Sequence, residues 1–208
     1  MRITAIEPRR HALSALFLDG EPAAQLDSET LLRSGYRVGS ELSGAELSAL
    51  KEASERRRAE EKALYLLEHR NHFKRELEEK LRRAVSAEAA QAAAGRMEQL
   101  GLIDDARYAR DYAARLLEQK GFSARRAQYE LCRKGVDRGL AERVVSELAP
   151  DPVEKIREIL ERKYPGARQD EKIRRRAAGA MQRLGYGFED IRRAMREWDE
   201  TTELDEDE

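Results

Sequence analysis

The sequence predicts a mainly α-helical protein, in which a small N-terminal α+β module precedes three tandem three-helix repeats of the helix-turn-helix type that form an elongated, curved rod. Three observations predict this fold class. Charged residues make up 39% of the 208 residues, aromatic residues 6%, and prolines number only 5, which is typical of helices with a large solvated surface. Alternation of period two is confined to the first 52 residues. Beyond them, one pattern recurs about every 50 residues.

The first 53 residues are expected to form the α+β module. Apolar and polar residues alternate over 2–7 and again over 12–18, and a third extended stretch follows at 23–26. This alternation predicts a small sheet. The Asp19-Gly20 pair lies between the last two strands and can adopt the positive φ angles of a type I′ hairpin.

Two helices complete the module. Asp27 is placed to cap a short helix that ends at Gly35. Ser43 and Glu46 have the spacing of a capping box, which predicts a second helix that continues through Leu50.

From about residue 54 the strand pattern disappears and nine helices are expected, each with its own start signal. They group into units at 54–103, 104–149 and 150–198, which should stack on their nearest neighbours. The side chains expected to cap these helices are those of Ser86, Asp104, Ser123, Asp137 and Asp151.

The second helix of each unit sets the register of the repeat. Its end carries an apolar residue followed two positions later by arginine, at spacings of 50: Leu81 and Arg83, Leu131 and Arg133, Met181 and Arg183. A second set of arginines has the same spacing of 50 residues: Arg75, Arg125 and Arg175. The second helix of the third unit is longer than the others, so the alignment of this set depends on where its extra residues lie. After these helices, Gly135 and Gly185 can take the left-handed conformation that ends a helix.

Charge is distributed unevenly along the chain. Residues 51–198 carry 35 basic and 27 acidic side chains, a balance of +8, whereas residues 1–50 carry 5 and 7, and residues 199–208 carry 0 and 7. One arginine per repeat would give a row of positive charge along the rod, suited to a phosphate backbone or to the acidic groove of a filament. The alternative is that the repeated arginines form salt bridges between neighbouring repeats.

Aromatic residues and the acidic end of the chain have simpler interpretations. Trp198 is expected to close the third bundle, and the acidic segment 199–208 is expected to be disordered, unless it masks the basic face until a partner displaces it. Five aromatic residues recur with leucines at helical spacing and are predicted to lie in the core rather than to stack on bases: Tyr65, Tyr108, Tyr112, Phe122 and Tyr129.

The sequence has no phosphate loop, no nucleophile elbow and no His-Glu-x-x-His helix, so we expect no enzymatic activity, no cofactor and no metal. The adjacent Asp104 and Asp105 would point about 100° apart on a helix, and a capping role explains them. His69 and His72, at i and i+3 on one helix face, lack a third ligand. The single cysteine, Cys132, is interpreted as a small packed residue. No apolar run reaches the roughly 18 residues that span a bilayer, so a cytoplasmic protein without membrane contact is expected.

Several stretches, taken in order, resemble the RecX family of RecA regulators. Residues 100–109 read Leu-Gly-Leu-Ile-Asp-Asp-Ala-Arg-Tyr-Ala, residues 120–123 read Lys-Gly-Phe-Ser, and residues 130–137 read Glu-Leu-Cys-Arg-Lys-Gly-Val-Asp. Further segments resemble the family's first repeat, its third repeat and the N-terminal extension of some members: 63–70 and 76–81, 184–191, and 19–21 with 38–42. The sequence departs from the family at two turns, where Ala84-Val85 replaces Lys-Gly and Gly187 replaces a serine-like cap.

The resemblance implies a modulator, usually an inhibitor, of the recombinase RecA in recombination and the SOS response. Such a protein lies along the groove of the RecA-DNA filament and interferes with filament growth, ATP hydrolysis, strand exchange and RecA-stimulated repressor cleavage. We therefore expect a monomer whose partner is the RecA filament and which contacts nucleic acid weakly or through that filament. We expect its partner-facing surface to consist of basic residues on the second helices: Arg82, Arg83, Arg125, Arg126, Arg133, Lys134, Arg174, Arg175, Arg176 and Arg183.

Two other functions fit the same pattern. A stand-alone helix-turn-helix-like DNA-binding protein would read duplex sequence with its third helices. The first three positions of those helices, 87–89, 138–140 and 188–190, carry one basic residue among nine, which argues against base readout. An α-solenoid scaffold would show neither nucleic-acid affinity nor an effect on RecA.

Overall fold

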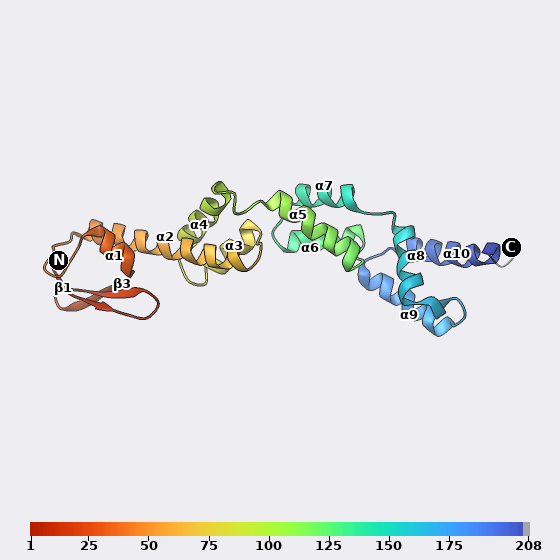
Figure 1. Cartoon of the computed structure of the whole chain (residues 1–208), viewed down its shortest axis with the longest axis horizontal. Coiled ribbons are helices and arrows are strands. Elements are labelled where there is room, and N and C mark those ends of the chain that lie inside the picture. Colours follow the sequence, from red (N-terminus) through yellow and green to blue (C-terminus); the bar gives the residue numbers. More distant parts are fainter. Residues whose placement is uncertain (206–208) are drawn as a thin grey trace. The chain divides into compact units, whose positions relative to one another are not determined.

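The structure is a computed structural model that describes the backbone of residues 1–205 and the side chains of residues 1–200. Within that part of the chain it contains ten α-helices and one three-stranded antiparallel sheet (Figure 1). This confirms the predicted mainly α-helical class with an N-terminal sheet. The chain divides into two compact units, Met1–Asp104 and Asp105–Glu208.

The sheet of the first unit follows the predicted hairpin pattern. Its strands β1 (Ile3–Pro8), β2 (Leu13–Leu18) and β3 (Glu21–Asp27) pair in the order β1-β2-β3. Asp19 and Gly20 connect β2 to β3 with φ angles of 51° and 92°, as a type I′ turn requires. The core beneath the sheet consists of Ile3, Leu16, Leu18, Leu26, Leu31, Leu42 and Leu50.

Predicted caps fix the ends of the module's helices. Helix α1 (Ser28–Ser34) begins at Asp27, whose carboxylate accepts a hydrogen bond from a first-turn N–H, and it ends at Gly35 with φ 74°. The next helix begins with the capping box, in which Ser43 and Glu46 each accept the other's backbone N–H.

Helix α2 (Gly44–His69) is one continuous helix of 26 residues, whereas two helices are predicted there. It runs through the expected boundary between residues 53 and 54, since no glycine or proline follows its first residue and its charged residues are good helix formers. Leu50 packs into the core beneath the sheet, while Ala59 and Ala63 lie in the core of the first repeat. The module and the first repeat therefore share a helix.

The first repeat is completed by α3 (Lys74–Leu81) and α4 (Ala87–Gln99), and α4 packs against both α2 and α3. Ser86 caps α4 as predicted. The turn before it contains no glycine, and α3 ends at Arg82 in the right-handed conformation. Small side chains let the three helices approach closely around Ala59, Ala63, Leu77, Leu81, Ala90, Ala93, Ala94, Met97 and Ile103.

The second repeat begins the second unit. Helix α5 (Asp105–Ala114) continues as a π-helical turn, η1 (Arg115–Gln119), and is followed by α6 (Ala124–Arg133) and α7 (Arg138–Leu148). Helices α5 and α6 both pack against α7. The predicted caps and the left-handed glycine are confirmed at Ser123, Asp137 and Gly135.

The third repeat has the same order of elements. It consists of α8 (Pro152–Lys163), a 3₁₀ turn η2 (Pro165–Ala167), α9 (Glu171–Leu184) and α10 (Phe188–Asp205). Trp198 is 3% exposed and closes the core of this bundle as predicted. Asp151 caps α8 and Gly185 ends α9.

Helix α10 continues to Asp205, which differs from the expectation of a disordered segment 199–208. Two ion pairs hold the start of the acidic segment to helices: Arg174 donates two hydrogen bonds to Asp199, at 3.1 and 2.8 Å, and Arg196 lies 3.9 Å from Glu200. Residues 206–208 lie outside the described part of the chain.

The predicted register of the repeat is confirmed by burial. Two positions of the second helix, four residues apart, are fully buried in all three repeats: Leu77 and Leu81, Ala127 and Leu131, Ala177 and Met181.

Candidate partner-binding surface

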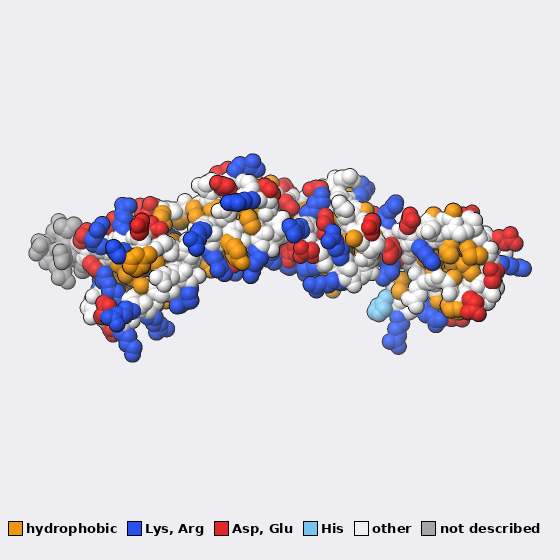
Figure 2. Space-filling model, turned by 180° about the vertical axis from the view of Figure 1, so that it is seen from behind, with side chains coloured by type: hydrophobic (Ala, Val, Ile, Leu, Met, Phe, Trp, Pro, Cys, Tyr) orange, Lys and Arg blue, Asp and Glu red, His pale blue; other side chains and the backbone are white. Residues whose placement is uncertain are grey.

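The basic residues predicted to face a partner lie on the outer sides of α3, α6 and α9 or just beyond their ends. Figure 2 shows Lys and Arg side chains spread over the surface and interspersed with acidic ones. Lys134 and two of the arginines, Arg126 and Arg174, are half-buried. The exposed members are Arg82, Arg83, Arg125, Arg133, Arg175, Arg176 and Arg183.

Four of the ten residues form ion pairs with nearby carboxylates. Glu130 of α6 is buried, and its carboxylate lies 2.8 Å from both Arg126 and Arg133. The two guanidinium groups neutralise a charge that would otherwise be costly to bury, so these arginines stabilise α6. Arg133 thus pairs within its own helix, and not between repeats as the alternative interpretation requires.

The other two engaged arginines belong to α9. Arg174 reaches across to Asp199 of α10, and this hydrogen bond raises the pKa of its guanidinium further above the ordinary value. Arg175 pairs with Glu171 of its own helix at 3.0 Å. Arg174 therefore joins two helices of one bundle, whereas Arg175 forms an exposed pair of small energetic value.

Five predicted residues form no ion pair with any described side chain: Arg82, Arg83, Arg125, Arg176 and Arg183. Each repeat contributes at least one of them, from its second helix or the turn that follows. Because their charges are not neutralised, these five are the members of the predicted set that can best attract an anionic partner.

Two of the five aromatic residues predicted to be buried are exposed. The exposed fractions of Tyr65 and Tyr129 are 53% and 58%. Both lie two positions after a fully buried alanine, Ala63 and Ala127, and two positions on a helix correspond to about 200° of rotation. The buried alanines define the inner faces of α2 and α6, and the sequence pattern of leucines and tyrosines alone missed this.

Arginine and lysine side chains lie over several of these rings. The guanidinium of Arg126 is 5.6 Å from the ring centroids of both Phe122 and Tyr129, and Lys62 is 4.7 Å from that of Tyr65. Phe188, at the start of α10, is 61% exposed and is covered by Arg192 at 4.7 Å. Sequence reasoning did not single out Phe188.

The second and third repeats meet closely. The backbone N–H of Ser123 donates to the carbonyl of Leu184 at 3.0 Å. A Cβ atom on Gly185 would lie 2.6 Å from the Ser123 hydroxyl and 2.7 Å from the Cβ of Arg126, so only glycine fits there. A cavity of about 330 Å³ opens beside this contact.

The described residues contain no group of three or more His, Cys, Asp or Glu side chains placed to hold a metal ion. His69 ends α2, and the chain is extended at Arg70, so His69 and His72 do not share a helix face as expected. Among the described helices, none combines the length and the apolar character needed to cross a membrane.

Comparison with known protein families gives two matches in the second unit. The model described as RecX, second three-helix domain, matches residues 104–145, and the model described as RecX, third three-helix domain, matches residues 150–195.

Curated relatives cover more of the chain. The regulatory protein RecX of Caldanaerobacter subterraneus subsp. tengcongensis is 28% identical over 183 residues, which are 86% of this chain and 90% of that protein. The regulatory protein RecX of Trichlorobacter lovleyi is 37% identical over 136 residues, which are 62% of this chain and 88% of that protein. The regulatory protein RecX of Streptomyces coelicolor is 33% identical over 62% of this chain and 73% of its own length.

Solved structures share the fold. A crystal structure of regulatory protein RecX matches with a TM-score of 0.62 at 17% identity, covering 94% of this chain and 98% of that one. The crystal structure of RecX from Lactobacillus salivarius matches with a TM-score of 0.60 at 20% identity, covering 71% and 98%.

Proposed function

The chain belongs to the RecX family, and on that premise we propose that it is a noncatalytic regulator of the recombinase RecA in recombination and the SOS response. It acts in the cytoplasm as a monomer. It binds along the groove of the RecA-DNA filament and inhibits filament growth, ATP hydrolysis, strand exchange and repressor cleavage. The three repeats, 54–103, 104–149 and 150–198, serve as successive binding units.

The observation that carries this proposal, beyond family membership, is the placement of unpaired arginines. Each repeat presents at least one on its second helix or in the turn that follows: Arg83 lies just after α3, Arg125 in the first turn of α6, and Arg183 in the last turn of α9. A filament offers a partner surface that repeats along its length, so a repeated charge can meet a repeated complement. Side chains that are not already paired lose little when they bind such a surface.

The experiment that tests the proposal measures ATP hydrolysis by RecA from the same organism on single-stranded DNA. The protein is titrated to substoichiometric ratios, and its binding to DNA alone is measured in parallel. Loss of hydrolysis at concentrations where it barely binds bare DNA is the expected result. An unchanged rate together with tight binding to duplex DNA would contradict it and would support a stand-alone DNA-binding protein.

A further inference from the structure

The proposed function gives no role to the acidic segment, residues 199–208. This segment carries 7 carboxylates and no basic side chain, and the backbone of α10 continues into it as far as Asp205 (Figure 1). Among the described side chains, the last one that α10 places in the core of the third bundle is that of Trp198. Asp199 is half-buried and Glu200 is exposed. Apolar packing therefore holds α10 up to Trp198, and polar contacts hold the residues that follow.

The contact that holds the start of the acidic segment is made to α9. Arg174 donates one hydrogen bond to each carboxylate oxygen of Asp199, at 3.1 and 2.8 Å. Such a two-pronged pair is stronger and more specific in geometry than a single hydrogen bond. The side chains of Arg174 and Asp199 are 30% and 41% exposed, so water reaches them and the pair can open without exposing the core.

The cation in this pair belongs to the surface predicted to face a partner. Three consecutive arginines of that surface lie on α9, namely Arg174, Arg175 and Arg176. Arg175 pairs with Glu171 of its own helix, whereas the carboxylate on Arg174 comes from another helix and from a segment of strong negative charge. An anionic partner that approaches α9 therefore meets a cation that is already neutralised, beside charges of its own sign.

We propose that the acidic segment competes with the partner for α9. In the free protein Asp199 occupies Arg174, and an anionic partner gains Arg174 only when the end of α10 beyond Trp198 moves away. The apparent affinity for the partner is then reduced by the fraction of molecules in which the pair is open. This autoinhibitory contact rests on the proposed function and adds to it a reason why weakly charged surfaces are not bound.

The alternative is that the pair only joins two helices of the bundle. Loss of Asp199 would then loosen α10 and would leave partner binding unchanged or weaker. Competition predicts the opposite sign, since removing the carboxylate frees the guanidinium for the partner. The direction of the effect of Asp199→Asn therefore separates the two interpretations.

The first test measures how much full-length protein half-inhibits ATP hydrolysis by RecA on single-stranded DNA. Asp199→Asn should need about 2- to 5-fold less protein than the unaltered chain, which is the range expected for a partly exposed ion pair. Glu200→Gln is the matched control, because it removes the same charge one position further along. Glu200 is exposed and pairs with Arg196 of its own helix, so this variant should inhibit as the unaltered protein does.

A double-variant cycle tests whether Asp199 acts through Arg174. If it does, adding Asp199→Asn to Arg174→Gln should change the half-inhibiting concentration no further, since the guanidinium that the carboxylate covers is already gone. An effect of the same size in both backgrounds would overturn the proposal, because Asp199 would then act through the general charge of the segment.

A second measurement contains no RecA. Trp198 is the one tryptophan of the chain, it is 3% exposed, and the guanidinium of Arg168 lies 4.3 Å from its ring centroid. Its fluorescence therefore reports on the end of α10. Asp199→Asn should raise the acrylamide quenching constant about 2-fold, because the end of the helix opens more often. Glu200→Gln should leave the constant unchanged.

Two results would each overturn the proposal: a quenching constant that Asp199→Asn does not raise, or half-inhibition by this variant that needs as much protein as the unaltered chain, or more. Thermal unfolding by circular dichroism confirms that the variants are folded. A failure of the unaltered protein to inhibit RecA would instead contradict the proposed function. The quenching comparison would then still support or overturn the contact assigned to Asp199.

Discussion

Arg57 shows how single side chains on α2 hold the N-terminal module in place. Its guanidinium lies 3.0 Å from the buried carboxylate of Asp27, at the end of β3, and also reaches Glu29 and Glu61 at 2.9 and 2.7 Å. On the preceding turn of the same helix, the hydroxyl of Ser54 accepts the backbone N–H of Asp27 at 2.6 Å. Sheet and helix are therefore tied together by polar contacts as well as by the leucine core.

Arg57→Ala should lower the free energy of unfolding by about 1–3 kcal/mol, because it leaves the buried Asp27 carboxylate without its counterion. Urea unfolding monitored by circular dichroism measures this. Arg33→Ala removes an exposed i,i+4 pair with Glu29 and should cost no more than about 0.5 kcal/mol. Equal losses in the two variants would contradict the role given to Arg57.

His72 should make the stability of the first unit depend on pH. Burial lowers the pKa of this histidine, the charge of Arg70 lowers it further, and Glu76 opposes the shift only partly. Since the folded pKa lies below the ordinary value of about 6.5, the unfolded chain takes up the proton first as the pH falls. The stability gained by burying the uncharged His72 is therefore fully present above about pH 6.5, and it is lost as the pH falls below that value.

Urea unfolding at pH 7.5 and 5.5 checks this expectation: the unaltered protein should be less stable at the lower pH. His72→Gln should show a smaller difference between the two pH values. An identical pH dependence in the variant would contradict the role given to His72.

At the scale of elements, the contact between α6 and the end of α9 depends on one glycine. Gly185 has φ 96°, and its missing Cβ leaves room for Ser123 and Arg126 of the second repeat. The same residue therefore ends a helix and lets two repeats meet.

Gly185→Ala should cost more stability than Gly35→Ala, by about 1–3 kcal/mol. Both glycines have positive φ, so both substitutions strain the backbone, but nothing lies within 4 Å of a Cβ on Gly35. The difference in unfolding free energy between the two variants isolates the steric clash. Similar costs would show that the repeats can shift apart without loss.

The sequence signals that proved reliable are local ones. Capping side chains and the left-handed glycines act on neighbouring backbone groups, so Ser43, Ser123, Asp151 and Gly185 could be placed without knowledge of the fold. The continuity of α2 could not be predicted in this way. Its first half carries the apolar residues of the module's core and its second half those of the first repeat's core, and this change in the sequence pattern resembles the boundary between two helices.

Surface positions were less predictable than caps. Tyr129 was assigned to the core because aromatic residues usually are buried, and only the burial of Ala127 and Leu131 fixes the outward direction of its ring. Likewise, Arg133 and Arg183 occupy the same place in their repeats, but only the second repeat has an acidic residue, Glu130, three positions earlier. Equal positions in a repeat therefore do not imply equal roles.

At the scale of the whole molecule, the net positive charge of residues 51–198 is larger than the positive charge available to bind a partner. Many of these arginines and lysines pair with carboxylates one helical turn away, as Arg193 does with Glu197. What remains is a small set of unpaired arginines, contributed by all three repeats. A regulator that uses them should lose function when they are neutralised without losing its fold.

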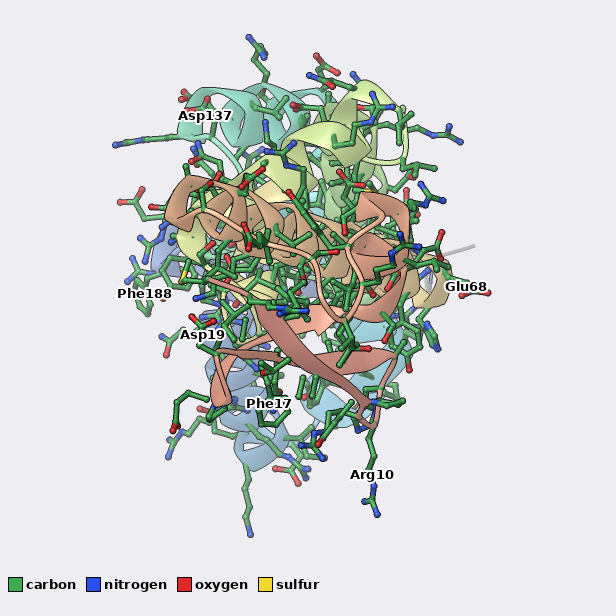
Figure 3. All side chains as sticks on the ribbon, turned by 90° about the vertical axis from the view of Figure 1, so that its left-hand side faces the viewer. Arg10, Phe17, Asp19, Glu68, Asp137 and Phe188 are labelled. Atoms are coloured by element: carbon green, nitrogen blue, oxygen red, sulfur yellow. The ribbon has the colours of Figure 1, made fainter. Side chains whose placement is uncertain are left out.

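The measurement that tests this account most directly is the inhibition of RecA-catalysed ATP hydrolysis by the triple variant Arg83→Gln, Arg125→Gln, Arg183→Gln. Arg10→Gln is its control, since Arg10 is an exposed arginine in the β1–β2 turn (Figure 3). We expect the triple variant to need at least about 10-fold more protein for half-inhibition, at low salt, while Arg10→Gln inhibits as the unaltered protein does. Equal inhibition by all three proteins would contradict the claim that the unpaired arginines of the repeats face the partner.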